Sequence, residues 1–590
     1  MRLMNKMHVR AAMLSLWMAG SLCLAQDRVA PDLLLVHGRV VTMDPHPVMP
    51  TAGAPATPAS HTAAPSAQAI AIAGDRVVWV GNDDAAQKLF PSVKNKIDLR
   101  GATVLPGIID AHTHLFELGK SLLRLNLKDV ATEEEAVARV RERVRAAPPG
   151  EWILGWGWDE GKWAGHYPDN EALSRAAPDN PVYLVGLHSF AGWANKKALA
   201  IAGVSAATKD PDNGRIVRDE KSGEPTGILL NRAQGLVESH VPPMSLEQTK
   251  KAIELAAKEC VRNGLTSVHE ARVSAMMIQA YHELLREDRL PLRIYVMLDG
   301  ADQALVKEWL SRGPEMDSNH RLTIRAFKLF ADGALGSRGA ALLAPYSDAP
   351  QSQGVVTTSQ DAIHDLTRRS LEKGFQVCTH AIGDAANRLT LDAYAQALRE
   401  TPSARDPRLR IEHAQVLAAE DIPRFSQLGV IPSMQPTHCT SDMGWAEKRL
   451  GAQRVQGAYA WQSLLKTHVH LPLSSDFPGE TLNPFYGIYA AITRQDIEGN
   501  PPGGWHAEQR LTLEEALRGY TLEGAYAEFE ENQKGSLQAG KLADLIVIDK
   551  DITQLESRPK EILSIHVMKT FVGGRLVFDE PARNEYSSKQ

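Results

Sequence analysis

The stretch LPGIIDAHTH, residues 105–114, reads as a short buried strand that ends in two histidines. Side chains alternate between the two faces of a strand, so His112 and His114 point the same way and can bind one metal ion. Asp110, two residues before the first histidine, could orient a ligand. The spacing alone is weak evidence, because His-x-His recurs at His468 and His470 and two ordinary strand histidines are the alternative.

Length and composition describe an ordinary globular protein. The chain has 590 residues, of which 43% are hydrophobic and 23% charged, with a formal net charge of −6. This length predicts one large domain with a smaller companion. The mild acidity gives no reason to expect nucleic acid or an anionic membrane as a partner. We expect a small-molecule substrate, and the sequence leaves open whether the chain forms a homodimer.

The first 25 residues have the pattern of a secretory signal peptide. Three Lys or Arg residues precede an apolar run over residues 11–25, and a polar residue follows. We expect cleavage after Ala25, an exported protein that is periplasmic or secreted, and no stable membrane insertion afterwards. An uncleaved anchor is the alternative, although the run is short for a bilayer span.

Both chain ends carry short alternating segments rich in β-branched residues, at 33–43, 69–81, 535–548 and 566–578. We predict that they fold together as a small β-sandwich domain built from residues 26–104 and 535–582. A stretch rich in Pro, Ala, Ser and Thr, residues 45–67, is expected to be a flexible loop.

The middle of the chain, residues 105–534, alternates strands with helices, which is typical of parallel α/β architecture. Eight strands with helical crossovers predict a (β/α)₈ TIM-like barrel, whose active site lies at the carboxyl ends of the strands. The gap after the first strand, about 116–241, predicts an inserted subdomain. The eight candidate strands are 104–110, 265–269, 293–298, 324–330, 375–380, 408–413, 429–434 and 469–475.

Six candidate metal ligands fall at matching strand ends on this map. A lone histidine at a strand end is more often structural, but six such residues together indicate a metal centre. A metal with an open coordination position lowers the pKa of bound water toward about 7, which generates hydroxide, and it polarises the carbonyl under attack. The six residues are His112, His114, Lys328, His380, His413 and Asp476.

Four motifs resemble the amidohydrolase superfamily: PGIIDAHTH (106–114), HAIGDAA (380–386), RIEHAQ (410–415) and SDFP (475–478). Two more, KLFADGA (328–334) and QPTH (435–438), narrow the resemblance to its YtcJ-like branch, known as amidohydrolase 3. The resemblance covers nearly the whole mature chain.

The resemblance implies that His112, His114, His380 and His413 bind divalent metal, usually zinc, as one or two ions. It implies Asp476 as a further ligand and as the catalytic proton shuttle. In members with two metals, a lysine at the position of Lys328 carries a carboxylate derived from CO₂ and bridges the ions. The alternative for Lys328 is an ammonium paired with Asp332 or another carboxylate.

The predicted reaction is hydrolysis of an amide-type C–N bond in a small molecule. An esterase, lactonase or cyclic amidase at the same centre is the alternative, because metal hydroxide does not by itself choose the leaving group. A non-catalytic binding or regulatory protein is the alternative from another class. We expect His438 to contact the substrate, and Trp158 and Trp193 to form an apolar wall, although each could equally be structural.

Overall fold

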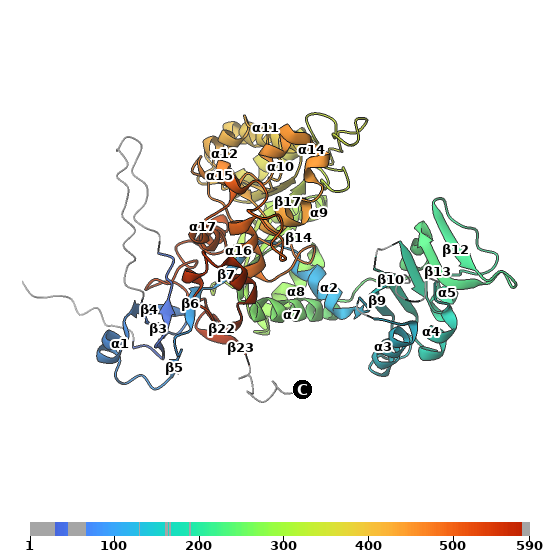
Figure 1. Cartoon of the computed structure of the whole chain (residues 1–590), viewed down its shortest axis with the longest axis horizontal. Coiled ribbons are helices and arrows are strands. Elements are labelled where there is room, and N and C mark those ends of the chain that lie inside the picture. The colour runs from blue at the N-terminus through green and yellow to red at the C-terminus, as the bar shows by residue number, and fades with distance from the viewer. Residues whose placement is uncertain are drawn as a thin grey trace, which may run out of the picture.

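A computed structural model describes residues 30–44, 67–128, 130–159, 163, 167–187 and 190–580. The expected signal peptide and nearly all of the expected flexible loop lie outside these residues. Within them, no helix combines the length and apolar character needed to cross a bilayer. Figure 1 shows a barrel, strands from the two chain ends beside it, and an inserted domain standing to one side.

Seven parallel strands form the barrel wall in the spatial order β20-β19-β18-β17-β15-β14-β7. The predicted first strand, 104–110, is divided in the structure: residues up to Pro106 belong to another sheet, and the barrel strand begins at Ile108. The strands are β7 (Ile108–Thr113), β14 (Leu265–Val273), β15 (Arg293–Asp299), β17 (Leu322–Phe330), β18 (Gln376–Ala381), β19 (Arg410–His413) and β20 (Ile431–Ser433), with β16 (Glu315–Met316) antiparallel to β17.

The predicted eighth strand, 469–475, is irregular but closes the barrel. Leu473 forms a parallel bridge with Met434 next to β20, and its carbonyl accepts the N–H of Ala111 in β7 at 3.3 Å. Pro472 has no N–H to donate, so a continuous ladder cannot form here. The (β/α)₈ fold class is therefore confirmed as a near-closed barrel of seven regular strands and one irregular segment.

Helices follow most of the barrel strands, and several of them begin at a residue whose side chain caps the helix. Ser245 and Gln248 form a capping box at the start of α7 (Leu246–Arg262), as the sequence predicts. Ser359 caps α10 (Gln360–Lys373), which ends at Gly374 with a φ of 80° that glycine adopts without strain. The other helices of the barrel region are α2 (Leu115–Leu123), α8 (Ala275–Arg286), α9 (Gln303–Arg312), α11 (Asp384–Glu400), α12 (Ile422–Leu428), α13 (Pro436–Asp442), α14 (Ala446–Arg454), α15 (Trp461–Leu465), α16 (Pro484–Thr493), α17 (Leu513–Gly519) and α18 (Leu522–Ala527).

Strands from the two chain ends pack together beside the barrel (Figure 1). Val104 lies opposite Val547 in an antiparallel pair, and both pack with Leu35 and Ile70 of a second sheet in one apolar core. The sheets are β4-β3-β1-β5, from β1 (Leu33–Val36), β3 (Ala69–Ala73), β4 (Arg76–Gly81) and β5 (Lys96–Asp98), and β2-β6-β21-β22-β23, from β2 (Arg39–Val40), β6 (Thr103–Pro106), β21 (Leu545–Ile548), β22 (Val567–Val572) and β23 (Arg575–Asp579); α1 (Asp83–Leu89) follows β4.

The segment between α2 and α7 forms the inserted domain, which has its own six-stranded sheet and its own apolar cores. It stands apart from the barrel in Figure 1. Its elements are β8 (Leu125–Asn126), α3 (Glu133–Arg145), β9 (Ile153–Trp158), α4 (Asn170–Ala176), β10 (Val182–Gly186), β11 (Ala191–Ala194), α5 (Lys196–Ile201), β12 (Gly214–Arg218), β13 (Pro225–Asn231) and α6 (Gly235–Glu238).

Candidate metal centre

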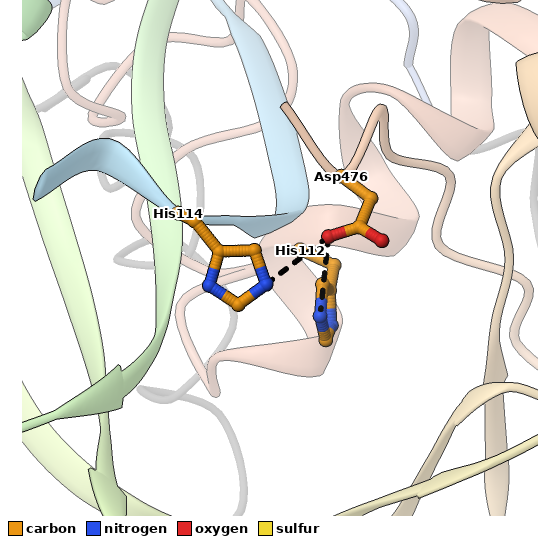
Figure 2. A group of neighbouring side chains, drawn as sticks. All are labelled: His112, His114 and Asp476. Atoms are coloured by element: carbon orange, nitrogen blue, oxygen red, sulfur yellow. Dashed lines mark ion pairs between the residues drawn. The ribbon is translucent and has the colours of Figure 1, made fainter. Parts of the chain in front are cut away.

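His112, His114 and Asp476 face one another where β7 ends (Figure 2). Oδ1 of Asp476 lies 3.2 Å from Nε2 of His114 and 3.8 Å from Nε2 of His112. The backbone N–H of Asp476 donates to the carbonyl of His112 at 3.0 Å, so the irregular eighth segment is fixed to the end of the first strand. One ligand atom from each of the three residues lies within 4.8 Å of the others, which is close enough to hold one metal ion.

A second group on the other side of Asp476 consists of His413 and His438. Nε2 of His438 lies 3.6 Å from Oδ2 of Asp476, and its ring stacks on that of His413 with centroids 5.7 Å apart. The ring of His380, from β18, lies 4.5 Å from the ring of His413. The structure therefore brings the four predicted histidines, Asp476 and His438 together, whereas His470 of the other His-x-His pair binds Glu523 elsewhere.

Three buried polar atoms at this centre lack a well-formed hydrogen bond to any described residue: Nζ of Lys328, Nε2 of His380 and Oδ1 of Asp476. Nε2 of His380 has only Oδ1 of Asp332 at 3.4 Å, and Oδ1 of Asp476 has only its ion-pair contacts with His112 and His114. A buried polar atom without a partner costs free energy, so such atoms in one place call for a missing partner. A divalent ion accepts imidazole nitrogen and carboxylate oxygen as ligands. The residues present therefore fit a metal.

The buried amine of Lys328 has no carboxylate partner among the described residues. Burial lowers the pKa of its amine to about 8, against the opposing effect of Glu412 and Asp476. The alternative pairing with Asp332 is not formed, because Asp332 instead accepts three backbone N–H groups at 2.8 to 3.0 Å, from Ala341, Ile382 and Gly383.

Glu412 orients His112, a role that the sequence did not reveal. Its Oε2 lies 2.5 Å from Nδ1 of His112, and its Oε1 lies 2.7 Å from Nε of Arg410. Burial raises the pKa of Glu412, but Arg410 and His112 outweigh it and hold the pKa well below its usual range. Burial and nearby Lys328 lower the pKa of His112 to about 4. The neutral ring therefore donates its Nδ1 proton to Glu412 and leaves Nε2 free to bind metal.

Asp110 does not orient an imidazole, which corrects the role suggested by its position. Its Oδ2 accepts the Ser475 hydroxyl at 2.6 Å, and its Oδ1 accepts the backbone N–H groups of Ser475 and His112 at 3.1 and 3.3 Å. Burial raises the pKa of Asp110 to about 7. This carboxyl therefore ties the segment that carries Asp476 to the strand that carries His112.

Gln435 fixes the ring of His413 in the same way that Glu412 fixes His112. Nε2 of Gln435 donates to Ser474 Oγ at 2.9 Å, and its Oε1 faces Nδ1 of His413 at 2.8 Å. Because an amide oxygen can only accept, Nδ1 of His413 carries the proton and Nε2 is free to act as a ligand. His413 and Asp476 have φ angles of 73° and 62°, a strained backbone of the kind found at functional sites.

A buried chain of polar side chains continues from Glu412 through the barrel. Nη1 of Arg410 lies 2.8 Å from Nδ1 of His269, and Nε2 of His269 lies 3.4 Å from Glu528, which pairs with Lys534 at 3.0 Å. Burial lowers the pKa of His269, so its ring is neutral. A guanidinium only donates, so Nδ1 of His269 accepts and its proton lies on Nε2, toward Glu528.

A cavity of about 440 Å³ opens over the histidine cluster. His438 lines it together with five metal-site candidates, and its contact with a substrate stays a prediction. Beyond the histidines and Asp476, the residues around it are Phe330, Ala334, Leu335, Gly336, Ile382, Gln415, Ser441, Asp442, Trp445 and Glu480.

Trp158 and Trp193 do not line this cavity, which corrects the expected aromatic wall. Both are fully buried in the core of the inserted domain, where their rings meet edge to face with centroids 6.0 Å apart. Their indole N–H groups donate to the backbone carbonyls of Leu184 and Asp169 at 2.9 and 2.8 Å. The sequence showed a cluster of tryptophans but not which core it would fill.

The family model described as "Amidohydrolase family" matches residues 96–578, well over half of the chain. The chain belongs to the amidohydrolase family. Among relatives of this amidohydrolase, YtcJ of Bacillus subtilis (strain 168) is 32% identical, with 82% of this chain and 90% of YtcJ covered. The N-substituted formamide deformylase of Arthrobacter pascens is 30% identical, with 87% of this chain and 95% of the deformylase covered.

A crystal structure of an uncharacterized metal-dependent hydrolase from Pyrococcus furiosus resembles this amidohydrolase with a TM-score of 0.72. The two chains are 29% identical, and the match covers 88% of this chain and 100% of the other. The resemblance expected from the sequence motifs is confirmed. The protein is a hydrolase of the amidohydrolase family.

Proposed function

We propose that this amidohydrolase cleaves an amide-type C–N bond of a small molecule, with Asp476 as the proton shuttle. The observation that carries the proposal is the position of Asp476, whose carboxylate faces His112 and His114 on one side and His438 on the other. One relative is named an N-substituted formamide deformylase, and a formamide contains such a bond.

The residues that would hold one or two divalent ions are His112, His114, Lys328, His380, His413 and Asp476. A divalent ion bound there supplies a Lewis acid for the carbonyl and lowers the pKa of bound water. Zinc suits the site because neutral imidazole and carboxylate are ligands that it takes in catalytic centres with an open position.

Asp476 is an ionised carboxylate that lies among the candidate ligands, where it can accept a proton. Burial raises the pKa of its carboxyl, but His114 and the other histidines around it outweigh burial and hold the pKa well below its usual range. The ionised carboxylate would accept the proton of the attacking water and return it to the departing nitrogen. Nε2 of His438 would donate a hydrogen bond to the substrate carbonyl oxygen as charge develops there.

Lys328 is suited to carry a carboxylate derived from CO₂. Carboxylation needs a neutral amine, and burial lowers the pKa of Lys328 to about 8. The Nζ lone pair would attack the carbon of CO₂ and lose a proton, which leaves a carbamate. The new oxygens would lie in a centre where Nζ now has no hydrogen-bond partner among the described residues.

Metal analysis of three variants tests the proposal. We expect His112→Ala to lose metal, because the variant lacks a ligand, and Asp476→Asn to keep metal but lose turnover, because an amide cannot shuttle the proton. His470→Ala is the control: it removes a histidine of the second His-x-His pair, outside the site. Equal metal content in the wild type and His112→Ala would count heavily against the site.

A substrate panel at fixed metal content separates amide from ester hydrolysis. Hydroxide generated at the same centre could attack the carbonyl of an amide or of an ester. Measured kcat/KM values for paired amides, lactones and esters therefore decide which reaction the protein favours. Faster ester than amide cleavage, relative to the uncatalysed rates, would replace the proposed reaction with ester hydrolysis.

A further inference from the structure

The cavity lining includes four large apolar side chains, which we call the apolar wall and which include two aromatic rings. Phe330 ends β17, and its ring centroid lies 5.4 Å from that of His380, so the wall begins beside the metal-site candidates. Trp445 precedes α14 and is half-buried. Leu335 and Ile382 complete the apolar lining. A substrate carbonyl over the histidines would therefore carry one substituent against this wall.

Gly336 leaves the space that the ring of Trp445 occupies. A Cβ added at Gly336 would lie 3.2 Å from both Cζ2 and Cη2 of the indole, closer than ordinary van der Waals contact. Any side chain at residue 336 would therefore press on the ring. The position of the indole in the cavity depends on the absence of a side chain at this glycine.

The cavity lining also contains polar and acidic residues, which we call the acidic rim: Ser441, Asp442 and Glu480. Glu480 accepts the Ser441 hydroxyl at 2.6 Å, and Asp442 accepts Nε2 of Gln415 at 2.9 Å. Among the described residues, no Lys or Arg lines the cavity to balance these carboxylates. A substrate with its own carboxylate at this rim would be repelled.

We propose that the substrate is an amide whose substituent is a flat apolar ring and carries no carboxylate, with Trp445 and Gly336 as the residues that determine this specificity. The ring packs against Trp445 and Phe330 while the carbonyl lies over the histidines. A cavity of about 440 Å³ is large enough for a ring and an amide group. This inference rests on the amide hydrolysis proposed above, because it assigns the substrate of the same site.

The first test compares three amides with the zinc-loaded full-length protein: N-benzylacetamide, N-butylacetamide and 4-(acetamidomethyl)benzoate. We expect kcat/KM for the benzyl amide to exceed that for each of the others by roughly 10-fold or more, since ring contact favours the first and the acidic rim repels the third. Equal values for the benzyl and butyl amides would overturn the proposal.

Four variants test whether the apolar wall causes the preference for the benzyl amide over the butyl amide. Trp445→Ala should remove most of the benzyl preference and change kcat/KM for the butyl amide less than about threefold. Gly336→Ala keeps the tryptophan but displaces its ring, so it should lower the benzyl preference as well. Trp445→Phe should restore part of it, which guards against a variant that merely folds poorly. Trp152→Ala, in the inserted domain, is the control and should keep the preference.

Calorimetric binding of the same three amides separates the two proposals. If none is cleaved, the amide hydrolysis proposed above fails, but tighter binding of the benzyl amide than the butyl amide, lost in Trp445→Ala, still supports the apolar subsite. Equal binding of the benzyl and butyl amides, or a benzyl preference that survives Trp445→Ala, overturns the subsite whatever the catalytic result.

Discussion

Oε2 of Glu412 lies 2.5 Å from Nδ1 of His112, across 300 residues of sequence and inside the barrel. This contact fixes which nitrogen of a candidate ligand carries the proton. We expect Glu412→Gln to weaken zinc affinity by roughly 10- to 100-fold, since the partners that orient metal-binding histidines have effects of this size. Competition with a chelator measures it, and Glu420→Gln, at an exposed glutamate, is the control. Unchanged affinity in Glu412→Gln would mean that the contact does not orient the ligand.

His269 should act on the same ligand through Arg410. The amide oxygen of asparagine can take the place of Nδ1, whereas that of glutamine lies near the place of Nε2. We therefore expect His269→Asn to keep zinc affinity within about threefold, and His269→Gln to lose roughly 10-fold because Arg410 loses its acceptor. Chelator competition and urea unfolding of both variants separate ligand positioning from stability. Equal affinity losses in the two variants would contradict a specific role for Nδ1.

Lys328 should determine the number of bound ions if it carries a carboxylate. Lys328→Met keeps much of the side-chain volume but has no amine, so we expect its metal content to fall from two ions towards one per chain. Wild-type protein equilibrated with ¹³C-labelled bicarbonate should show a carbamate carbon by NMR, and Lys328→Met should not. Lys373→Met, at an exposed lysine, is the control. Identical metal content and no carbamate signal in the wild type would leave Lys328 as a buried amine.

Asp110 should impose a pH dependence on the stability of the metal-free protein. Burial raises its folded-state pKa from 3.8 to about 7, so between these values the native state holds a proton that the unfolded state has released. The unfolding free energy therefore falls as pH rises from about 4 to about 7, by at most about 1.4 kcal/mol per pH unit.

Asp110→Asn removes this titration while its amide can still bond to Ser475. We would measure the unfolding free energies of both proteins in urea from pH 4 to pH 8. The value for the variant minus the value for the wild type should rise up to about pH 7 and then stay constant. Parallel curves would show that Asp110 does not titrate in this range.

Trp193 should contribute to the stability of the inserted domain and have no effect on substrate binding. Its ring is fully buried in the inserted domain, so Trp193→Ala should cost about 3–5 kcal/mol of unfolding free energy there. Trp193→Phe loses chiefly the hydrogen bond to Asp169 and should cost about 1 kcal/mol. Urea unfolding followed by circular dichroism measures both, with KM expected to stay constant. A higher KM at unchanged stability would return this residue to the substrate site.

The sequence by itself determined the barrel, the helix caps and the candidate ligands. These features follow from local rules: strand periodicity places His112 and His114 on one face, and Ser245 begins a helix because its side chain bonds to the N–H three residues on. Matching strand ends then predicted that His380, His413 and Asp476 would meet these two histidines.

Only the tertiary structure decided which neighbours these residues have. That Glu412 orients His112, that Asp110 binds Ser475, and that Trp445 rather than Trp193 lines the cavity all depend on contacts between distant parts of the chain. The eighth barrel segment likewise closes the wall through bonds to β20 and β7 despite Pro472. Local sequence sets the direction of a side chain along its own strand, but packing between elements decides what it meets there.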